Sequence, residues 1–160
     1  MTSRRGAANG TGGGTHLRRA LARGAAALVL AALPAGLAGS AEAAAGTDHL
    51  YRGETLQRNQ KLVRSTQNGS RVELVMQIDG NLVLYNNGTP THGRRVCWAS
   101  NTANNGAYAV YQSDGNFVVY NSARRPTWAS HTQNDGGSTV NINNYGQLWA
   151  GNKRLSSFCA

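Results

Sequence analysis

Hydrophobic and polar residues follow two different patterns along the chain. From Ala25 to Leu37 the residues are almost continuously apolar, and Arg-rich sequence precedes them. After Gly46 the pattern changes to short runs rich in Val, Thr and Tyr, separated at short intervals by Asn, Gly and Asp. No helical periodicity extends over a useful length in this second part. Strand-forming runs with frequent turn signals predict an all-β domain over residues 46–160.

The first segment, residues 1–45, has the features of a secretory signal peptide. Its apolar stretch is too short to span a bilayer and contains Pro34. Small residues follow and fit the A-x-A rule for signal cleavage, which predicts a cut within residues 43–46. We therefore expect a secreted protein with no membrane span after signal removal; a membrane anchor or a plain amphipathic helix is the alternative. An Arg pair before the apolar stretch leaves both the Sec and the twin-arginine route open.

A nine-residue motif occurs twice in the second part. Residues 77–85 read QIDGNLVLY and residues 112–120 read QSDGNFVVY, which is a period of 35 residues. Downstream, WASNT at 98–102 matches WASHT at 128–132. A third copy over residues 139–152 keeps the glycine, but every polar position of the motif has changed and its Trp-Ala pair arrives early. Three repeats predict three similar units around one axis.

Side chains alternate between the two faces of a strand or hairpin, so the motif divides into two sets. A three-residue loop Asp-Gly-Asn at 79–81 would pair Ile78 with Leu82 and Met76 with Leu84. The apolar set is expected in the core: Met76, Ile78, Leu82, Leu84, Tyr111, Phe117 and Val119. The other set is expected on an outward face: Gln77, Asp79, Asn81, Val83 and Tyr85 in the first copy, and Gln112, Asp114, Asn116, Val118 and Tyr120 in the second.

The outward set contains groups that bind sugar hydroxyls. A carboxylate accepts hydrogen bonds, amides both donate and accept, and a phenol does either. Valine can contact the apolar C–H surface of a sugar ring. The alternative is that the motif is only a stable hairpin in which Gln and Tyr form a cross-strand pair.

The same set lacks the groups that catalysis needs. Each copy contains a single carboxylate, whereas glycoside hydrolysis needs a pair, so we expect no enzyme and no catalytic residue. The histidines have no metal-ligand spacing, and no bidentate acid follows the Asp-x-Asn fragment as in a calcium loop. We therefore expect no metal and no cofactor.

The formal charge of +9 at pH 7 does not indicate nucleic-acid binding. Residues 1–45 hold five arginines and one acid, which leaves 11 basic and 6 acidic side chains, or +5, for the rest of the chain. Basic residues cluster there only as three adjacent pairs without interleaved aromatics: Arg94-Arg95, Arg124-Arg125 and Lys153-Arg154. We expect no nucleic-acid partner.

Both cysteines, Cys97 and Cys159, lie in the part predicted to be exported. An oxidising compartment favours one intramolecular disulfide between them. Two free thiols or an intermolecular bond are the alternatives.

The exported part is similar to the bulb-type, or monocot mannose-binding, lectins over nearly all of residues 48–152. The resemblance implies a β-prism II fold: three four-stranded antiparallel sheets around a pseudo-threefold axis, with the tryptophans packed near that axis. It also implies that the Gln, Asp, Asn and Tyr of the two intact copies hydrogen-bond α-D-mannose, and that the third copy is degenerate. The matching segments are GETL at 53–56, MQIDGNLVLYN at 76–86, CWASNT at 97–102, QSDGNFVVYN at 112–121 and PTWASHT at 126–132.

The sequence departs from this family in three places. The motif tyrosine is followed by tryptophan after 13 residues in the first repeat (Tyr85 to Trp98) and after 8 in the second (Tyr120 to Trp128), so the first repeat carries an inserted loop. Neither cysteine looks placed for the family's usual bridge. The C-terminal tail differs as well, which puts the strand-swapped dimers of plant members in doubt, although an oligomer is possible.

The sequence as a whole predicts a lectin exported by a bacterium, with mannose-containing glycans as its partners. Two alternatives use the same fold for another purpose. One is a lectin-like bacteriocin, and the other is an envelope interaction protein.

Overall fold

A computed structural model describes residues 46–88 and 93–160, and the predicted signal peptide lies outside these ranges. The described residues form strands and turns without a helix, so no helix among them could cross a membrane. The strands are β1 (His49–Tyr51), β2 (Thr55–Gln57), β3 (Lys61–Ser65), β4 (Arg71–Met76), β5 (Leu82–Asn86), β6 (Arg95–Ala99), β7 (Tyr108–Tyr111), β8 (Phe117–Tyr120), β9 (Pro126–Ala129), β10 (Thr139–Ile142), β11 (Leu148–Ala150) and β12 (Lys153–Arg154).

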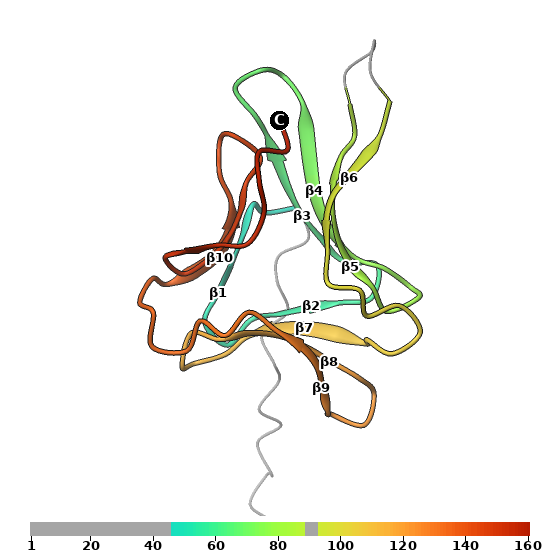
Figure 1. The fold of residues 1–160 in the computed structure, drawn as a ribbon, viewed down its shortest axis with the longest axis vertical. Coiled ribbons are helices and arrows are strands. Elements are labelled where there is room, and N and C mark those ends of the chain that lie inside the picture. The colour runs from blue at the N-terminus through green and yellow to red at the C-terminus, as the bar shows by residue number, and fades with distance from the viewer. Residues whose placement is uncertain (1–45, 89–92) are drawn as a thin grey trace, which may run out of the picture. The chain divides into compact units, whose positions relative to one another are not determined.

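The strands form three four-stranded antiparallel sheets, which confirms the predicted β-prism II fold. The sheet orders are β3-β4-β5-β6, β2-β7-β8-β9 and β1-β10-β11-β12. Figure 1 shows the three sheets as the sides of a triangle around a shared interior. Only the first sheet consists of consecutive strands, because β1 and β2 complete the two sheets whose other strands come later in the chain.

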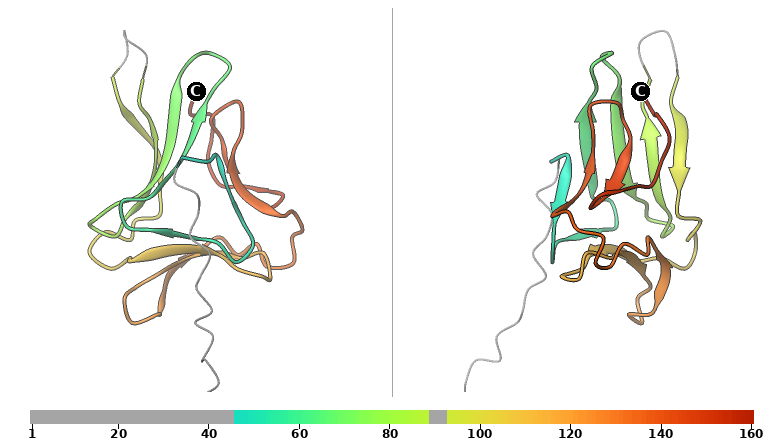
Figure 2. Two further views of the ribbon diagram at one scale, coloured as in Figure 1. Left: turned by 180° about the vertical axis from the view of Figure 1, so that it is seen from behind. Right: turned by 60° about the vertical axis from the view of Figure 1, so that its left-hand side comes forward.

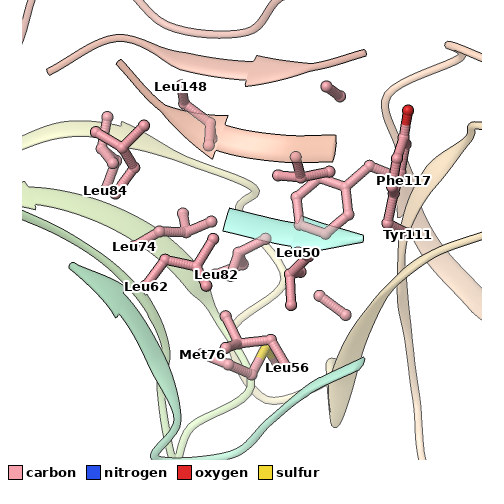
Figure 3. Close-up of a cluster of buried hydrophobic side chains, with 14 of the residues drawn as sticks. Leu50, Leu56, Leu62, Leu74, Met76, Leu82, Leu84, Tyr111, Phe117 and Leu148 are labelled. Atoms are coloured by element: carbon pink, nitrogen blue, oxygen red, sulfur yellow. The ribbon is translucent and has the colours of Figure 1, made fainter. Parts of the chain in front are cut away.

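The core lies where the inner faces of the three sheets meet. Leu50, Leu56 and Leu62, one from each of the first three strands, are completely buried, and Figure 3 shows them directed toward the same interior. Burying one such side chain contributes roughly 1.5–3 kcal/mol. Trp98 and Trp128 pack against this core and meet edge to face, with ring centroids 5.2 Å apart.

One residue predicted in the core is not there. Ile78 is 69% exposed, whereas the other six predicted core residues are fully buried. The hairpin pairs Met76 with Leu82 and Leu74 with Leu84, so its loop spans the five residues 77–81 and the predicted pairing was wrong. Strand alternation stops at Met76 and resumes at Leu82. Because the error in register was two residues, each strand residue keeps the face that was predicted for it.

The third tryptophan also differs from expectation. Trp149 lies between Leu148 and Ala150, whose side chains are buried, so the alternation along β11 places Trp149 on the outer face of its sheet. It pairs with Asn141, as Val83 of the first repeat pairs with Val75. Trp149-Ala150 is therefore not an early copy of the other Trp-Ala pairs, and packing near the axis holds for only two of the three tryptophans.

The predicted disulfide is confirmed. Cys97 in β6 is bonded to Cys159 in the tail, with the two Cα atoms 5.6 Å apart, and no free cysteine remains. Asn86 donates a hydrogen bond from its amide nitrogen to the carbonyl oxygen of Cys159, and Arg95 donates to the same oxygen at 3.3 Å. The tail is thereby fixed beside the β3–β6 sheet, where Figure 2 shows the C-terminal end.

Candidate functional site

One five-residue turn occurs in all three sheets, at residues 77–81, 112–116 and 143–147. In each, the first residue donates its main-chain N–H to the carbonyl oxygen of the fifth, at 2.9, 2.9 and 3.0 Å. The fourth residue is always glycine with a positive φ, 91° at Gly80, and a Cβ there would lie 2.1 Å from the carbonyl oxygen of Gly106. The glycine and the turn are thus explained by folding alone.

A hydrogen-bonded Gln–Tyr pair accompanies this turn in two sheets. Gln77 donates from Nε2 to the hydroxyl oxygen of Tyr85 at 2.7 Å, and Gln112 donates to Tyr120 at 2.8 Å. Because each phenol oxygen accepts a bond, its own hydrogen stays available for donation to another acceptor. The third sheet has Gly151 at the position of the tyrosine and cannot form the pair.

The asparagine of each intact motif is held by residues that the sequence analysis did not assign. The side-chain oxygen of Asn81 accepts hydrogen bonds from the main-chain N–H of Thr102 at 3.1 Å and from the hydroxyl of Ser100 at 3.2 Å. Ser130 and Thr132 hold Asn116 in the same way, at 3.2 and 3.3 Å.

These bonds occupy the amide oxygen, so the amide nitrogen is the group left to donate outward. The signal in the sequence was the Ser-x-Thr of WASNT and WASHT, which had been recorded only as a repeat.

In each intact repeat a hydrogen bond joins the predicted Gln and Tyr, and the predicted Asp and Asn lie in the turn that begins at that Gln. We call the group Gln77, Asp79, Asn81 and Tyr85 the first site, and the group Gln112, Asp114, Asn116 and Tyr120 the second site. In each, one carboxylate oxygen of Asp accepts the main-chain N–H of the following Asn, at 2.9 Å in the first and 2.8 Å in the second. The other carboxylate oxygen remains for a ligand.

The two valines of the motif contribute less than expected. Val83 and Val118 lie on the outward face of their sheets, but each is only 2% exposed. Neighbouring side chains therefore cover most of the apolar surface that was predicted to contact a sugar ring.

The two sites differ in what lies beside the tyrosine. Tyr85 pairs across the sheet with Glu73, which forms salt bridges of 2.9 Å with both Lys61 and Arg71. Tyr120 pairs instead with Tyr108, and the two rings stack with centroids 5.6 Å apart. Sequence reasoning missed Glu73 and Tyr108, although correct counting outward from the five-residue turn identifies both.

Burial raises the pKa of Glu73, but hydrogen bonds with Asn87, Lys61 and Arg71 more than offset this and lower the pKa to about 2. Glu73 is therefore a carboxylate at neutral pH, with its charge neutralised by neighbours.

Lectins of monocotyledonous plants are similar to this chain in sequence and in structure. A mannose-specific lectin from Aloe arborescens is 44% identical over 78 residues, which are 48% of this chain and 62% of that lectin. A lectin structure from Allium sativum has 36% identity and a TM-score of 0.52, and the match covers 64% of this chain and 90% of that one. The mannose-specific agglutinin of snowdrop (Galanthus nivalis) bulbs, complexed with methyl-α-D-mannoside, has 31% identity and a TM-score of 0.53, covering 69% of this chain and 94% of that one. No protein-family model matches the chain.

Identity above 30% over nine-tenths of a solved lectin, together with the shared fold, decides the family. The chain belongs to the bulb-type lectins. Lectins bind carbohydrate without transforming it, so this bulb-type lectin is not an enzyme, as expected from the single carboxylate of each motif.

The third face of this bulb-type lectin displays a solvent-exposed aromatic pair at the same turn. At the position of Asp79 it has Tyr145, whose ring meets that of Phe158 edge to face at 5.9 Å. Asn143 donates to the side-chain oxygen of Gln147 at 2.8 Å, and its own side-chain oxygen accepts the main-chain N–H groups of Tyr145 and Gln147. Trp149 stands in the place of valine, and the third copy has neither the carboxylate nor the Gln–Tyr pair of the intact motifs.

A shallow hollow of about 340 Å³ lies over this third sheet and not over either intact site. Its charged side chains are already paired: Asp48 binds the ring nitrogen Nδ1 of His49 at 2.7 Å and the guanidinium of Arg64. Burial raises the pKa of Asp48, but these two partners lower it overall. We interpret the network as structural, because its groups satisfy one another.

The described part of the chain, residues 46–88 and 93–160, contains no group of three His, Cys, Asp or Glu side chains that could hold a metal ion.

Proposed function

We propose that this bulb-type lectin binds α-D-mannose or mannosides at the first and second sites. The observation that carries the proposal is the difference between repeats that share one turn. The Gln–Tyr pair and the asparagine held by Ser and Thr occur together in two copies and are both missing from the third. Since the third turn is formed without them, turn stability does not account for these residues. Two relatives described as mannose-specific support the choice of sugar.

Each site leaves donors and acceptors unsatisfied, and the resemblance to bulb-type lectins implies which mannose hydroxyls they would contact. The free carboxylate oxygen of Asp79 or Asp114 accepts a hydrogen bond from the axial 2-hydroxyl of mannose. The amide nitrogen of Asn81 or Asn116 donates to the oxygen of the same hydroxyl. The tyrosine hydroxyl, which accepts from glutamine, serves the 4-hydroxyl. Each of these bonds replaces one to water, so the net gain per site is small.

We also propose that the lectin is exported from a bacterial cell. The apolar stretch and small residues within 1–45 support a cleaved signal, and a disulfide persists in an oxidising compartment. N-terminal sequencing of protein recovered from the culture medium tests this. A chain that keeps residues 1–45 would contradict it.

Titration calorimetry tests the binding proposal. Methyl α-D-mannoside should bind in the millimolar range, which corresponds to about −4 kcal/mol, with a stoichiometry of two. Mannan should bind more tightly through multivalency. Methyl α-D-glucoside is the matched control, because it differs only in the orientation of the 2-hydroxyl, and should bind much more weakly. No heat with mannosides, or three equivalent sites, would contradict the proposal.

A further inference from the structure

We propose that the first site selects mannosides that carry an anionic group, a phosphate or a carboxylate, and that Arg94 recognises that group. This inference rests on the proposed sugar-binding function. It assigns a ligand class to one of the two sites, which the motif alone makes equivalent.

Arg94 is placed directly on the tyrosine of the first site. Its guanidinium carbon lies 3.6 Å from the centroid of the Tyr85 ring, and the residue is exposed. In such a stack the flat faces of the two groups meet, so the N–H donors on the rim of the guanidinium point away from the ring. No salt bridge within the described ranges involves Arg94. A fork of N–H donors matches the paired oxygens of a carboxylate or phosphate.

The backbone next to Arg94 is fixed from the other side. Arg95 pairs with Asn86 in β5 and donates hydrogen bonds to the carbonyl oxygens of Cys159 and Ala160, at 3.3 and 3.4 Å. Two residues further, Cys97 is bonded to Cys159. Arg94 directly precedes β6, so the residue that follows it is anchored to the tail while its own guanidinium lies over the Tyr85 ring. A guanidinium held in this way loses less entropy when it binds an anion.

Charge around the first site favours an anion on the tyrosine side. The buried carboxylate of Glu73 is shared by two cations, Lys61 and Arg71, so it does not cancel the charge of Arg94 as well. The remaining acid, Asp79, lies in the turn and repels an anion there. Repulsion by Asp79 therefore favours a ligand whose anionic group lies beside Tyr85, where Arg94 is.

The second site has no equivalent of this arrangement. Tyr108 stands where the first site has Glu73, and it stacks on Tyr120. No cation–π contact among the described residues involves Tyr120. Arg52 lies near the second turn, but it donates to the carbonyl oxygens of Ser113 at 2.7 Å and Gly137 at 2.8 Å. We therefore expect no preference for anionic mannosides at the second site.

Variants with one intact site separate the two preferences. Asp114→Ala leaves the first site, and Asp79→Ala leaves the second. Each is titrated with methyl α-D-mannoside, mannose 6-phosphate and methyl α-D-mannosiduronate, so that the phosphate and the carboxylate are tested separately. The first site should bind at least one anionic sugar about fivefold more tightly than the neutral one, and this gain should shrink as NaCl is raised. The second site should show no such gain.

Arginine variants in the Asp114→Ala protein assign the effect. Arg94→Ala should abolish the preference, whereas Arg124→Ala, the matched control in the shorter loop of the second repeat, should leave it unchanged. Equal binding of neutral and anionic sugars at the first site would overturn the inference while leaving the proposed function intact. Inorganic phosphate that competes as well as mannose 6-phosphate would also overturn it, because the anion would then be recognised without the sugar. Failure of all mannosides to bind would refute the proposed function itself.

Discussion

The faces of the second and third sheets are built on the same turn and serve different ends. Both turns close with the same main-chain bond, Gln112 to Asn116 at 2.9 Å and Asn143 to Gln147 at 3.0 Å. On the second sheet the turn displays an exposed carboxylate. On the third it displays Tyr145, which packs against the tail residue Phe158. The comparison teaches that the turn supplies the framework, and that the side chains placed on it decide between a polar face and an exposed aromatic pair.

The largest expected effect comes from releasing the tail that the third face supports. Replacing both cysteines, Cys97→Ser with Cys159→Ser, removes a crosslink between positions 62 apart in sequence, for which the chain-entropy model gives about 4 kcal/mol. Urea unfolding should show a loss of this order. Mannan binding at the second site should persist under native conditions, because that site lies on another sheet. If the folded double-cysteine variant also lost mannan binding at the second site, the two faces would not be independent.

Removing the turn carboxylates should abolish binding and spare the fold. In the variant Asp79→Ala with Asp114→Ala, each site loses a charged acceptor, which is worth roughly 1.5–3 kcal/mol, so a millimolar ligand falls below detection. Calorimetry with mannan measures the loss, and circular dichroism checks the β structure. Tyr145→Ala is the control at the same turn position of the third face, and it should bind mannan normally. Normal binding by the double Asp variant would place the sugar site elsewhere.

Acid should distinguish the first sheet from the second, which has Tyr108 in place of Glu73. The pKa of Glu73 in the folded protein is about 2, below its ordinary value of 4.5. A carboxyl group with a lowered pKa stabilises the fold above pH 4.5, and this contribution is lost as pH falls toward 2.

The free energy of unfolding should fall by about 1–3 kcal/mol from pH 7 to pH 2.5, which urea unfolding at the two pH values measures. Asp48, whose pKa is also lowered, acts in the same direction, so Glu73→Gln is the comparison. Parallel curves for the wild type and this variant would show that Glu73 does not contribute.

The smallest effect should come from the residues behind the asparagine. Thr102 donates its hydroxyl hydrogen to the carbonyl oxygen of Gly80 at 2.7 Å, and the bond is buried. Thr102→Val keeps the volume and removes this bond, so we expect a loss of about 1 kcal/mol in stability and weaker binding at the first site. Titration of the Asp114→Ala background detects the second change. Unchanged affinity at the first site would show that binding does not depend on the bond between the Thr102 hydroxyl and Gly80.

The fold could be predicted because it depends on local pattern. The repeated motif fixed the number of sheets, and alternation along strands separated Leu82 and Leu84, which are buried, from Tyr85 on the outer face. The prediction for Ile78 was wrong because a five-residue turn interrupts that alternation. The Asp-Gly-Asn sequence does not determine the length of the loop. The prediction for Trp149 was wrong because the Trp-Ala pair was used to align the third repeat. The turn glycine, Gly146, is the position that the three repeats share.

What the sequence did not reveal are contacts between segments that are distant in the chain. Ser100 and Thr102 hold Asn81 across 19 and 21 positions, and Lys61 reaches Glu73 from another strand. The stacking of Arg94 on Tyr85 joins a motif residue to a residue outside the motif. Such contacts are set by the three-dimensional arrangement of strands, so a motif can identify the site but not its neighbours.

The order of strands in the three sheets has a consequence for the rate and sequence of folding. The β3–β6 sheet joins neighbouring strands, but β1 pairs with β10, which brings Leu50 against Val140. Bringing such distant strands together costs loop-closure entropy before their contacts form, so long-range pairing slows folding. As the chain emerges from the ribosome, residues 61–99 can form a sheet while β1 still lacks a partner. The sheet that contains both β1 and β12 is then the last to close, and oxidation of Cys97 must wait for Cys159.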